Sequence, residues 1–218
     1  MSRFPVIAID GPVAAGKGTL ARRLASHLGL RHLDSGMIYR AAAARLLAGG
    51  GSPDDTGAAE RAARELTAED LHRPNLREQA IGQAASKIAA MQAVRDVLLA
   101  FQRTFASQKP GAVIDGRDIG TVVCPDADVK LYVTAGLEER ARRRYEELLE
   151  RSAGPNLDEI RAEIAERDRR DMEREVAPLK MAADAILLDT SRLDAEQAFL
   201  QALEIVVAQL NAALKTSI

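Results

Sequence analysis

A glycine-rich segment directly after a short apolar run constrains this chain more than any other feature. The segment Gly11–Thr19 reads Gly-Pro-Val-Ala-Ala-Gly-Lys-Gly-Thr and follows the apolar residues 6–9. Its Gly-x-x-x-x-Gly-Lys spacing is that of a phosphate-binding loop (P-loop), in which glycines let backbone N–H groups approach phosphate oxygens. A helix expected over 19–28 would add its positive N-terminal end. The pattern therefore predicts a nucleoside triphosphate site, and the alternative interpretation is a strand-to-helix turn without a ligand.

Two side chains of this segment have predicted roles of their own. Lys17 would place a positive charge near the β- and γ-phosphates. The usual pattern has Ser or Thr after this lysine, whereas here Gly18 follows it and the hydroxyl comes with Thr19, which is a candidate ligand of Mg²⁺. The predicted nucleotide-binding residues are Gly11, Pro12, Val13, Ala14, Ala15, Gly16, Lys17, Gly18 and Thr19.

The composition argues against several other classes of protein. The 218 residues contain 30 Lys and Arg and 32 Asp and Glu, a net charge of −2, which argues against a broad nucleic-acid-binding surface. The single cysteine, Cys124, excludes an intramolecular disulfide and a cysteine-based zinc site, so we expect a cytoplasmic protein. No apolar run approaches the roughly 18 residues of a membrane span, so we expect no membrane partner. Aromatic residues are only 3%, so hydrogen bonds should carry any base recognition.

Short apolar runs alternate with helical segments along the chain. This alternation predicts an α/β fold with a five-stranded parallel sheet and helices on both faces. The expected strands are 4–9, 30–33, 112–115, 129–133 and 185–188. The expected helices are 19–28, 37–48, an Ala-rich segment up to about 66, two helices within 76–105 that bend near 90–91, and 137–150, 158–176 and 194–214, with a break at 152–156. No strand signal lies between 33 and 111, so residues 37–104 should form a helical insertion.

Polar side chains follow two of the expected strands. The loop that begins at Asp115 should lie at the carboxyl end of a central strand, where open α/β sheets hold ligands. Asp115 could hold Mg²⁺ through water, while Arg117 and Asp118 could meet an anion and a polar group. Ser35 and Arg40 follow the second strand at the same edge. The alternative for the loop is a tight turn with a surface ion pair.

The strongly charged helix expected over 158–176 presents a second candidate surface. Arg167, Arg170, Asp171 and Arg174 fall at i, i+3, i+4 and i+7, so they lie on one helix face and could present three guanidinium groups to phosphates. The alternative is a solvated, salt-bridged face. Structural or surface roles are expected for the remaining candidates, whose spacing fits no metal site: His27, His32, His72 and the small residue Cys124.

Read together, the motifs of the chain resemble those of one enzyme family. They are Ile9-Asp10-Gly11-Pro12 with Ala15-Gly16-Lys17-Gly18-Thr19, Leu33-Asp34-Ser35-Gly36 with Tyr39-Arg40, Ala85-Ser86 and Val94-Arg95, Asp115-Gly116-Arg117-Asp118-Ile119-Gly120-Thr121-Val122-Val123, and Glu166-Arg167-Asp168-x-Arg170-Asp171 before Ala177-Pro178-Leu179. In this order they resemble bacterial cytidylate kinases over essentially the whole chain. The resemblance implies Mg²⁺-dependent phosphoryl transfer from ATP to CMP or dCMP by a monomer with the fold of P-loop nucleoside monophosphate kinases.

The resemblance also implies roles for individual residues. The acceptor's phosphate would be held by Arg40, Arg117 and Arg174. Cytosine would be read by Ser86, Arg95 and Asp118, and the sugar hydroxyls by Arg167 and Asp171, with Ser35 also at the acceptor. Charge that develops during transfer would be neutralised by Lys17, Arg117, Arg170 and Arg174. Residues 1–36, 105–145 and 177–218 would form the core, 37–104 the monophosphate-binding insertion and 146–176 a small lid.

Three questions stay open at this stage. Many bacterial members of the family carry a small antiparallel sheet in the insertion, and residues 49–76 are too few and too helical to contain it. The closure of the insertion and the preference among CMP, dCMP and UMP are therefore open. So is whether Asp34 or Asp115 holds the metal. The alternatives to a cytidylate kinase are a kinase for another small acceptor, such as a shikimate-like metabolite, and a regulator that binds ATP without transferring phosphate.

Overall fold

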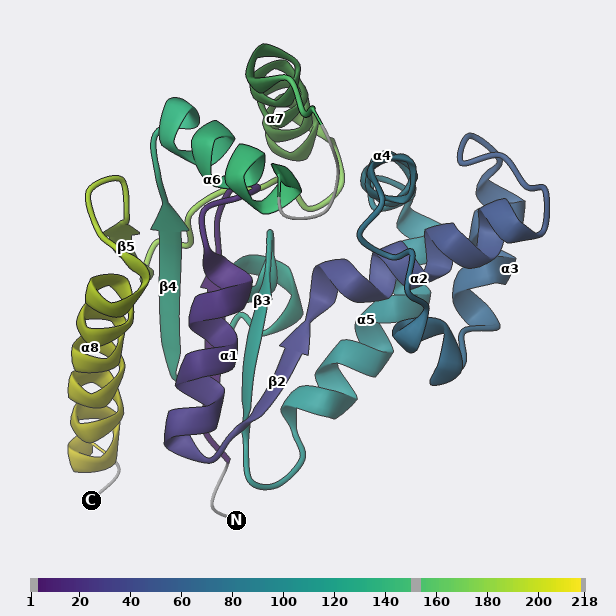
Figure 1. Cartoon of the computed structure of the whole chain (residues 1–218). Coiled ribbons are helices and arrows are strands. Elements are labelled where there is room, and N and C mark those ends of the chain that lie inside the picture. Colours follow the sequence, from purple (N-terminus) through teal and green to yellow (C-terminus); the bar gives the residue numbers. More distant parts are fainter. Residues whose placement is uncertain (1–3, 150–153, 217–218) are drawn as a thin grey trace.

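Five short apolar segments form one parallel sheet in the computed structural model, which describes residues 4–149 and 154–216. Along the sheet the strands run in the order β2-β3-β1-β4-β5, and each pairs in parallel with its neighbours (Figure 1). The strands are β1 (Val6–Asp10), β2 (Arg31–Asp34), β3 (Ala112–Gly116), β4 (Val129–Thr134) and β5 (Ile186–Asp189). The predicted five-stranded parallel sheet is therefore confirmed.

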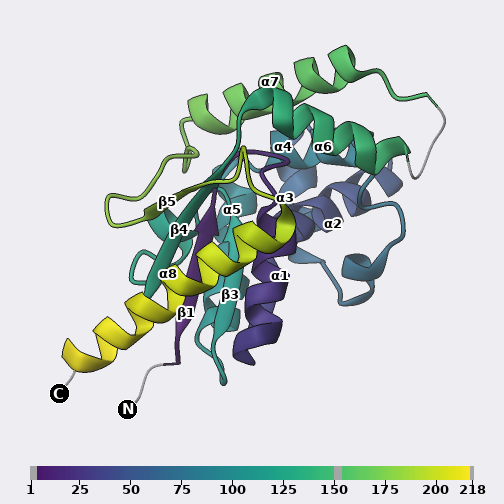
Figure 2. The ribbon, with the colours of Figure 1, turned by 60° about the vertical axis from the view of Figure 1, so that its left-hand side comes forward.

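Helices cover both faces of the sheet. Side chains alternate between the faces of a strand, and in β1 every residue is buried. Ile7 and Ile9 pack on one face with helices α1 (Lys17–Leu28) and α8 (Ala195–Thr216). On the other face the strands pack against α5 (Gln92–Ala106) and a short π-helix, η2 (Ile119–Val123). Figure 2 shows α8 crossing one of these faces. Burial of β1 on both sides explains why its sequence is a continuous apolar run.

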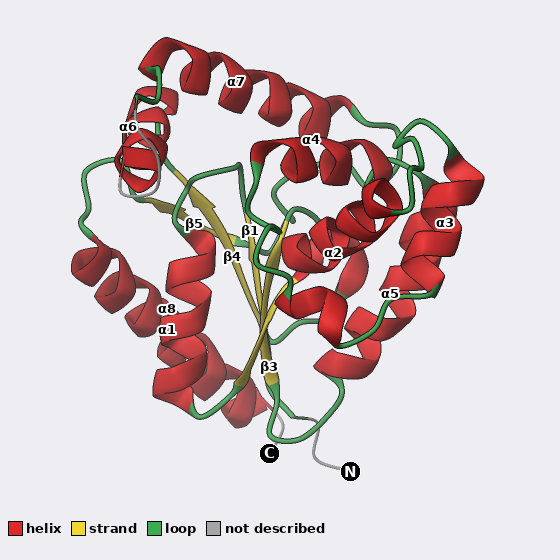
Figure 3. Cartoon of the chain, turned by 45° about the vertical axis from the view of Figure 1, so that its right-hand side comes forward, coloured by secondary structure: helices red, strands yellow, loops and turns green. Residues whose placement is uncertain are grey.

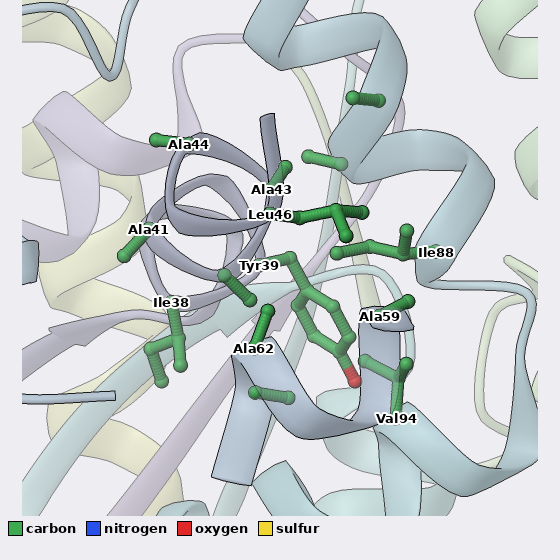
Figure 4. Packing of buried hydrophobic residues seen from close by; sticks show 14 of the residues in the cluster. Ile38, Tyr39, Ala41, Ala43, Ala44, Leu46, Ala59, Ala62, Ile88 and Val94 are labelled. Carbon is green, nitrogen blue, oxygen red and sulfur yellow. The ribbon is translucent and has the colours of Figure 1, made fainter. Parts of the chain in front are cut away.

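All of the chain between β2 and β3 is helical or irregular, as predicted (Figure 3). The elements of this insertion are α2 (Ser35–Ala48), α3 (Thr56–Arg64), a 3₁₀ turn η1 (Glu69–His72), α4 (Gln79–Ile88) and α5. Ala41, Ala42, Ala43 and Ala44 of α2 are all buried, so the neighbouring helices approach α2 closely (Figure 4). The insertion thus has its own core, which meets the core on one face of the sheet at Leu33 of β2.

After β4 the chain forms two helices that pack along each other, α6 (Leu137–Leu149) and α7 (Leu157–Glu173). We call this pair the lid hairpin, and it lies above the carboxyl ends of the strands (Figure 1). The predicted lid boundary at residue 146 falls inside α6. The predicted break at 152–156 lies partly outside the described residues. No helix among the residues described is both long enough and apolar enough to cross a membrane.

Several element bounds differ from the sequence-based expectation. Helix α7 ends at Glu173 instead of continuing to residue 176, because Arg174 has an extended ψ of 138°. The π-helix η2 was expected as a loop. Its first two N–H groups, those of Ile119 and Gly120, each donate a 2.7 Å hydrogen bond to the buried carboxylate of Asp10. A side chain more than 100 residues away thus supports this turn, and no local pattern encodes it.

Candidate active site

The P-loop connects β1 to α1 and depends on glycine at two positions. Gly11 has φ 146°, and a Cβ there would lie 1.9 Å from the carbonyl oxygen of Val133 in β4. Gly16 has φ 86° and immediately precedes the first residue of α1. A residue with a side chain would be strained at Gly16 and would collide with the strand at Gly11. The loop therefore passes close to β4 before it turns into the helix.

Lys17 is held inside this loop. Its side chain is buried, and Nζ donates a 2.5 Å hydrogen bond to the carbonyl oxygen of Pro12. Burial and the nearby Arg117 lower the pKa of Lys17 from 10.5 to about 7. A phosphate beside Nζ would oppose both effects and favour the charged ammonium. The lysine therefore occupies the position that the P-loop pattern predicts, with a charge that an anion would stabilise.

Two carboxylates face the start of α1. Asp34 and Asp115 are register partners at the ends of β2 and β3. A Cβ built on Gly18 would lie 3.7 Å from Asp115 Oδ2 and 3.9 Å from Asp34 Oδ2. The other oxygen of Asp115 hydrogen-bonds to His32 Nε2 at 2.8 Å. Burial and the neighbouring Asp115 raise the pKa of Asp34. Facing carboxylates beside a residue without a side chain fit a hydrated divalent cation.

A cleft of about 420 Å³ separates the insertion from the lid hairpin. Arg40, Arg144 and Arg167 line it, together with Val13 and Ala14 of the P-loop. Burial and Arg117 lower the pKa of Arg167 to about 9. Among the residues described, the Nε of Arg167 is buried without a hydrogen-bond partner. Burial and Arg144 also lower the pKa of Arg40. We call this space the arginine cleft, and its excess of positive charge suits an anion.

A smaller pocket of about 50 Å³ lies between α4, α5 and the end of β3. Within it Arg95 pairs with one oxygen of Asp118, and Arg174 Nη2 lies 3.4 Å from the other. Asp171 accepts a 2.8 Å hydrogen bond from Arg117 Nε; its pKa is lowered because the guanidinium groups outweigh its burial. We call this space the base pocket, after the predicted role of Ser86, Arg95 and Asp118. Eight sequence-predicted residues line it: Ser35, Ser86, Arg95, Arg117, Asp118, Arg167, Asp171 and Arg174. The volume of this pocket is well below the roughly 300–1,000 Å³ of usual small-molecule sites, because the ion pairs among its own side chains fill it.

A third cleft, of about 490 Å³, also borders the P-loop. Gly16 and Thr19 line it together with α6 and the chain between β5 and α8. Arg143 Nη1 donates a 3.1 Å hydrogen bond to the hydroxyl of Thr190 at its edge. Thr19 is exposed in this cleft, whereas Gly18 is the residue that faces the two carboxylates. Ala14 of the P-loop and Arg144 and Glu147 of α6 line both this cleft and the arginine cleft, so the two spaces adjoin at these residues.

Comparison with known proteins identifies the family that this arrangement belongs to. A family model described as cytidylate kinase matches residues 7–208. The chain is 56% identical to a cytidylate kinase of Paramagnetospirillum magneticum over 204 residues, which cover 92% of this chain and 97% of that protein. It is 53% identical to the cytidylate kinase of Agrobacterium fabrum over 205 residues, 94% of this chain and 98% of that protein. The chain belongs to the cytidylate kinase family.

A structural comparison agrees with the fold of this cytidylate kinase family member. A solved structure of an uncharacterized protein from Eubacterium ventriosum has a TM-score of 0.57 with this chain and covers 92% of this chain and 96% of its own. The two sequences are 12% identical, so this likeness concerns the fold alone.

Two placements differ from the sequence-based expectation. Arg170 lines neither the arginine cleft nor the base pocket. Its guanidinium instead donates to Gln83 Oε1 of α4 at 3.1 Å and to Glu166 Oε1 at 3.4 Å. Arg144 of α6, which we did not single out, does line the arginine cleft. Leu137, Ala141, Tyr145 and Leu148 of α6 form an apolar stripe at helical spacing, and Arg144 lies beside it, so this stripe could have indicated that Arg144 points inward.

Proposed function

We propose that the protein transfers the γ-phosphoryl group of ATP to CMP and dCMP, giving ADP and CDP or dCDP. The observation that carries the proposal is the arginine cleft, where four arginines face three glutamates and where Arg40 and Arg167 form no ion pair with any described residue. This cleft adjoins the P-loop on one side and shares Arg167 with the base pocket on the other. The phosphates of two nucleotides, one at the P-loop and one in the base pocket, would therefore meet there.

ATP would occupy the P-loop and the third cleft. Backbone N–H groups of the loop and the Nζ of Lys17 would hold its β- and γ-phosphates. Its nucleoside would lie in the cleft beside Thr19 and Thr190. In this position the γ-phosphate points past Ala14 toward the arginine cleft, since Ala14 borders both spaces.

The acceptor would occupy the base pocket and the arginine cleft. We propose that its phosphate is held by Arg40, Arg117 and Arg174 and its sugar hydroxyls by Arg167 and Asp171. Its base would be read by Ser86, Arg95 and Asp118. Cytosine offers an N4 amino donor to Asp118 and acceptors at N3 and O2 to Arg95 and Ser86. Uracil presents an oxygen where cytosine has its amino group, so Asp118 would be left without a partner and would disfavour it.

The carboxylate pair fits a magnesium ion. Asp34 and Asp115 would hold it, directly or through water, in keeping with the preference of Mg²⁺ for one or two carboxylates plus phosphates. When bound, the ion would neutralise charge on the phosphates. His32 would fix the orientation of Asp115 through their hydrogen bond. The predicted ligand Thr19 lines the ATP cleft, so we place it with the nucleotide instead.

The reaction requires positioning more than covalent chemistry. An oxygen of the acceptor's phosphate forms a bond to the γ-phosphorus, and the bond from that phosphorus to the β–γ bridging oxygen breaks, leaving its electron pair on ADP. A phosphate dianion is already a competent nucleophile, so no side chain has to remove a proton. Lys17 and Arg117 would stabilise charge on the transferring group. Closure of the lid hairpin would exclude water from it.

The first test is ADP release from Mg·ATP with CMP, dCMP, UMP, AMP, GMP and no acceptor, measured side by side. We expect turnover with CMP and dCMP that disappears in Lys17→Ala, which keeps the acceptor site intact. Turnover with none of the nucleotides, by a protein that binds ATP in calorimetry, would contradict the proposal. Sedimentation of the same sample tests whether the enzyme is a monomer, and cell fractionation tests its expected cytoplasmic location.

A further inference from the structure

The lid hairpin does not merely stand over the P-loop; it packs on it. Ala141 of α6 and Ile160 and Ile164 of α7 form a small buried cluster. The side chains of Val13 and Ala14, the outer limb of the P-loop, pack against this cluster. A change in the seating of the lid hairpin would therefore alter the packing of the loop that is to hold ATP.

One buried ion pair connects the same three elements. Asp168 of α7 accepts a 3.1 Å hydrogen bond from the backbone N–H of Val13 and pairs with Arg140 of α6. Arg140 in turn donates to the carbonyl oxygen of Val13 at 3.0 Å and, through Nε, to that of Ala135 at 2.8 Å. Both charged residues are 6–7% exposed. The N–H and the carbonyl of Val13 are thus both held by lid side chains.

The next residue explains why the loop needs such support. Ala14 has φ 59°, a left-handed conformation that costs a residue with a Cβ roughly 1–2 kcal/mol. Strained residues of this kind persist where the surrounding structure fixes them. Because the peptide units before and after the Val13 Cα are both held, Ala14 is kept in the conformation in which it borders both clefts.

Asp168 cannot serve to attract ATP, because its carboxylate carries the same sign of charge as the phosphates. A carboxylate next to a triphosphate-binding loop repels the ligand, and Arg140 cancels only that repulsion. We propose that Asp168 and Arg140 are positioning residues that hold the P-loop in its phosphate-binding conformation and thereby make ATP binding depend on the seated lid. The inference rests on the proposed function for its ligand, ATP, and its test does not require phosphoryl transfer.

The decisive variant is Asp168→Asn, which keeps the shape of the side chain and removes its charge. We expect its dissociation constant for Mg·ATP, measured by calorimetry without acceptor, to rise at least five-fold. Its rate of ATP hydrolysis at saturating ATP without acceptor should also rise, because a lid hairpin that packs loosely on the P-loop admits water. The matched control is Arg169→Ala. Arg169 is the next residue of α7, its side chain is 58% exposed, and within the described part of the chain its ion pairs are with Glu166 and Glu173 of the same helix.

An ATP affinity that is unchanged or tighter in Asp168→Asn would overturn the proposal, because loss of a repelling charge alone predicts tighter binding. A second change tests the strain directly. Glycine adopts positive φ without penalty, so Ala14→Gly added to Asp168→Asn should restore part of the ATP affinity, and no restoration would also count against the proposal. Should Asp168→Asn lack a cooperative melting transition, Arg140→Lys takes its place with the same expectations. Wild-type protein that binds ATP but transfers nothing would refute the proposed function while leaving this test intact.

Discussion

Replacement of Asp118 by Asn would test how the base pocket selects its nucleotide. The side chain is 6% exposed, and its carboxylate meets Arg95 on one oxygen and Arg174 on the other. The amide has nearly the same shape but no charge. It can accept one hydrogen bond and donate another, so it can pair with cytosine or with uracil by turning over. We therefore expect the choice between CMP and UMP to weaken.

The magnitude follows from the contact that is lost. A good pair of hydrogen bonds to a base edge is worth about 1–3 kcal/mol of discrimination, so the ratio of kcat/KM for CMP to that for UMP should fall by about 5- to 150-fold. Stability should fall too, because Arg95 loses its buried partner; breaking such a pair costs about 3–5 kcal/mol. The amide oxygen still accepts from Arg95, so we expect the lower end, a Tm lower by about 6–12 °C for a chain of this size.

The assay is ADP release at acceptor concentrations well below KM, with CMP and UMP run in parallel on the same enzyme sample. Partly unfolded enzyme lowers both rates equally, so the ratio reports on recognition alone. Asp158→Asn is the control, since the Asp158 side chain is 83% exposed at the start of α7. If the Tm falls but the CMP to UMP ratio stays that of the wild type, Asp118 is only a structural partner of Arg95 and the proposed base reading is wrong.

Three further predictions concern other contacts. Burial raises the pKa of Asp10 from 3.8 to about 6, so protonation favours the folded state; relative to Asp10→Asn, the wild type should lose about 2 kcal/mol of unfolding free energy as the pH rises from 4 to 6, measured by denaturant titration. Asp70→Ala should cost about 2–4 kcal/mol in the same assay, because its 3% exposed side chain bonds to three neighbours, whereas Asp54→Ala, at a 70% exposed side chain, should cost under about 0.5 kcal/mol. Gln83→Ala and Arg170→Ala break the same contact between the insertion and the lid hairpin. Their effects on kcat/KM for CMP should therefore be non-additive in the double variant. Strict additivity would show that the contact has no role.

The parts of the site that sequence predicts well are those whose chemistry is local. The P-loop is recognisable because its conformation requires glycine at Gly11 and Gly16, and the lysine follows directly in the chain. Asp34 and Asp115 meet because parallel strands end at one edge of a sheet, which a strand pattern already implies. The P-loop residues are neighbours in the sequence, and the pairing of parallel strands brings the two aspartates together.

The lid hairpin was less predictable for a physical reason. Helix α6 carries four arginines within five residues. Its apolar stripe of Leu137, Ala141, Tyr145 and Leu148 lies next to Arg144 but about equally far from Arg140 and Arg142, so the pattern cannot tell which of these two turns inward. Arg140 and Arg144 point toward the P-loop side, whereas Arg142 pairs with glutamates of its own helix in solvent. Which arginine turns inward depends on how α6 packs on α7 and on Val13. Asp168 likewise belongs to a recognisable sequence motif, but its contact with Val13 depends on how the lid hairpin packs on the P-loop, which the motif does not encode.

The two ends of the acceptor site differ in a way that bears on specificity. The arginine cleft is open, about 420 Å³, and its Arg40 and Arg167 pair with no described carboxylate, whereas the base pocket, about 50 Å³, is filled by the pairing of Asp118 with Arg95. On the proposed function, any nucleoside monophosphate is attracted to the cleft by its phosphate, since that attraction ignores the base. Entry of the base then requires the buried pair to separate. Cytosine can offer both partners a replacement, and uracil leaves the Asp118 carboxylate unpaired in a buried site. Selection between the bases is therefore strongest at the base pocket, which has to open. For this reason the ratio of kcat/KM for CMP to that for UMP is more informative than the affinity for either nucleotide.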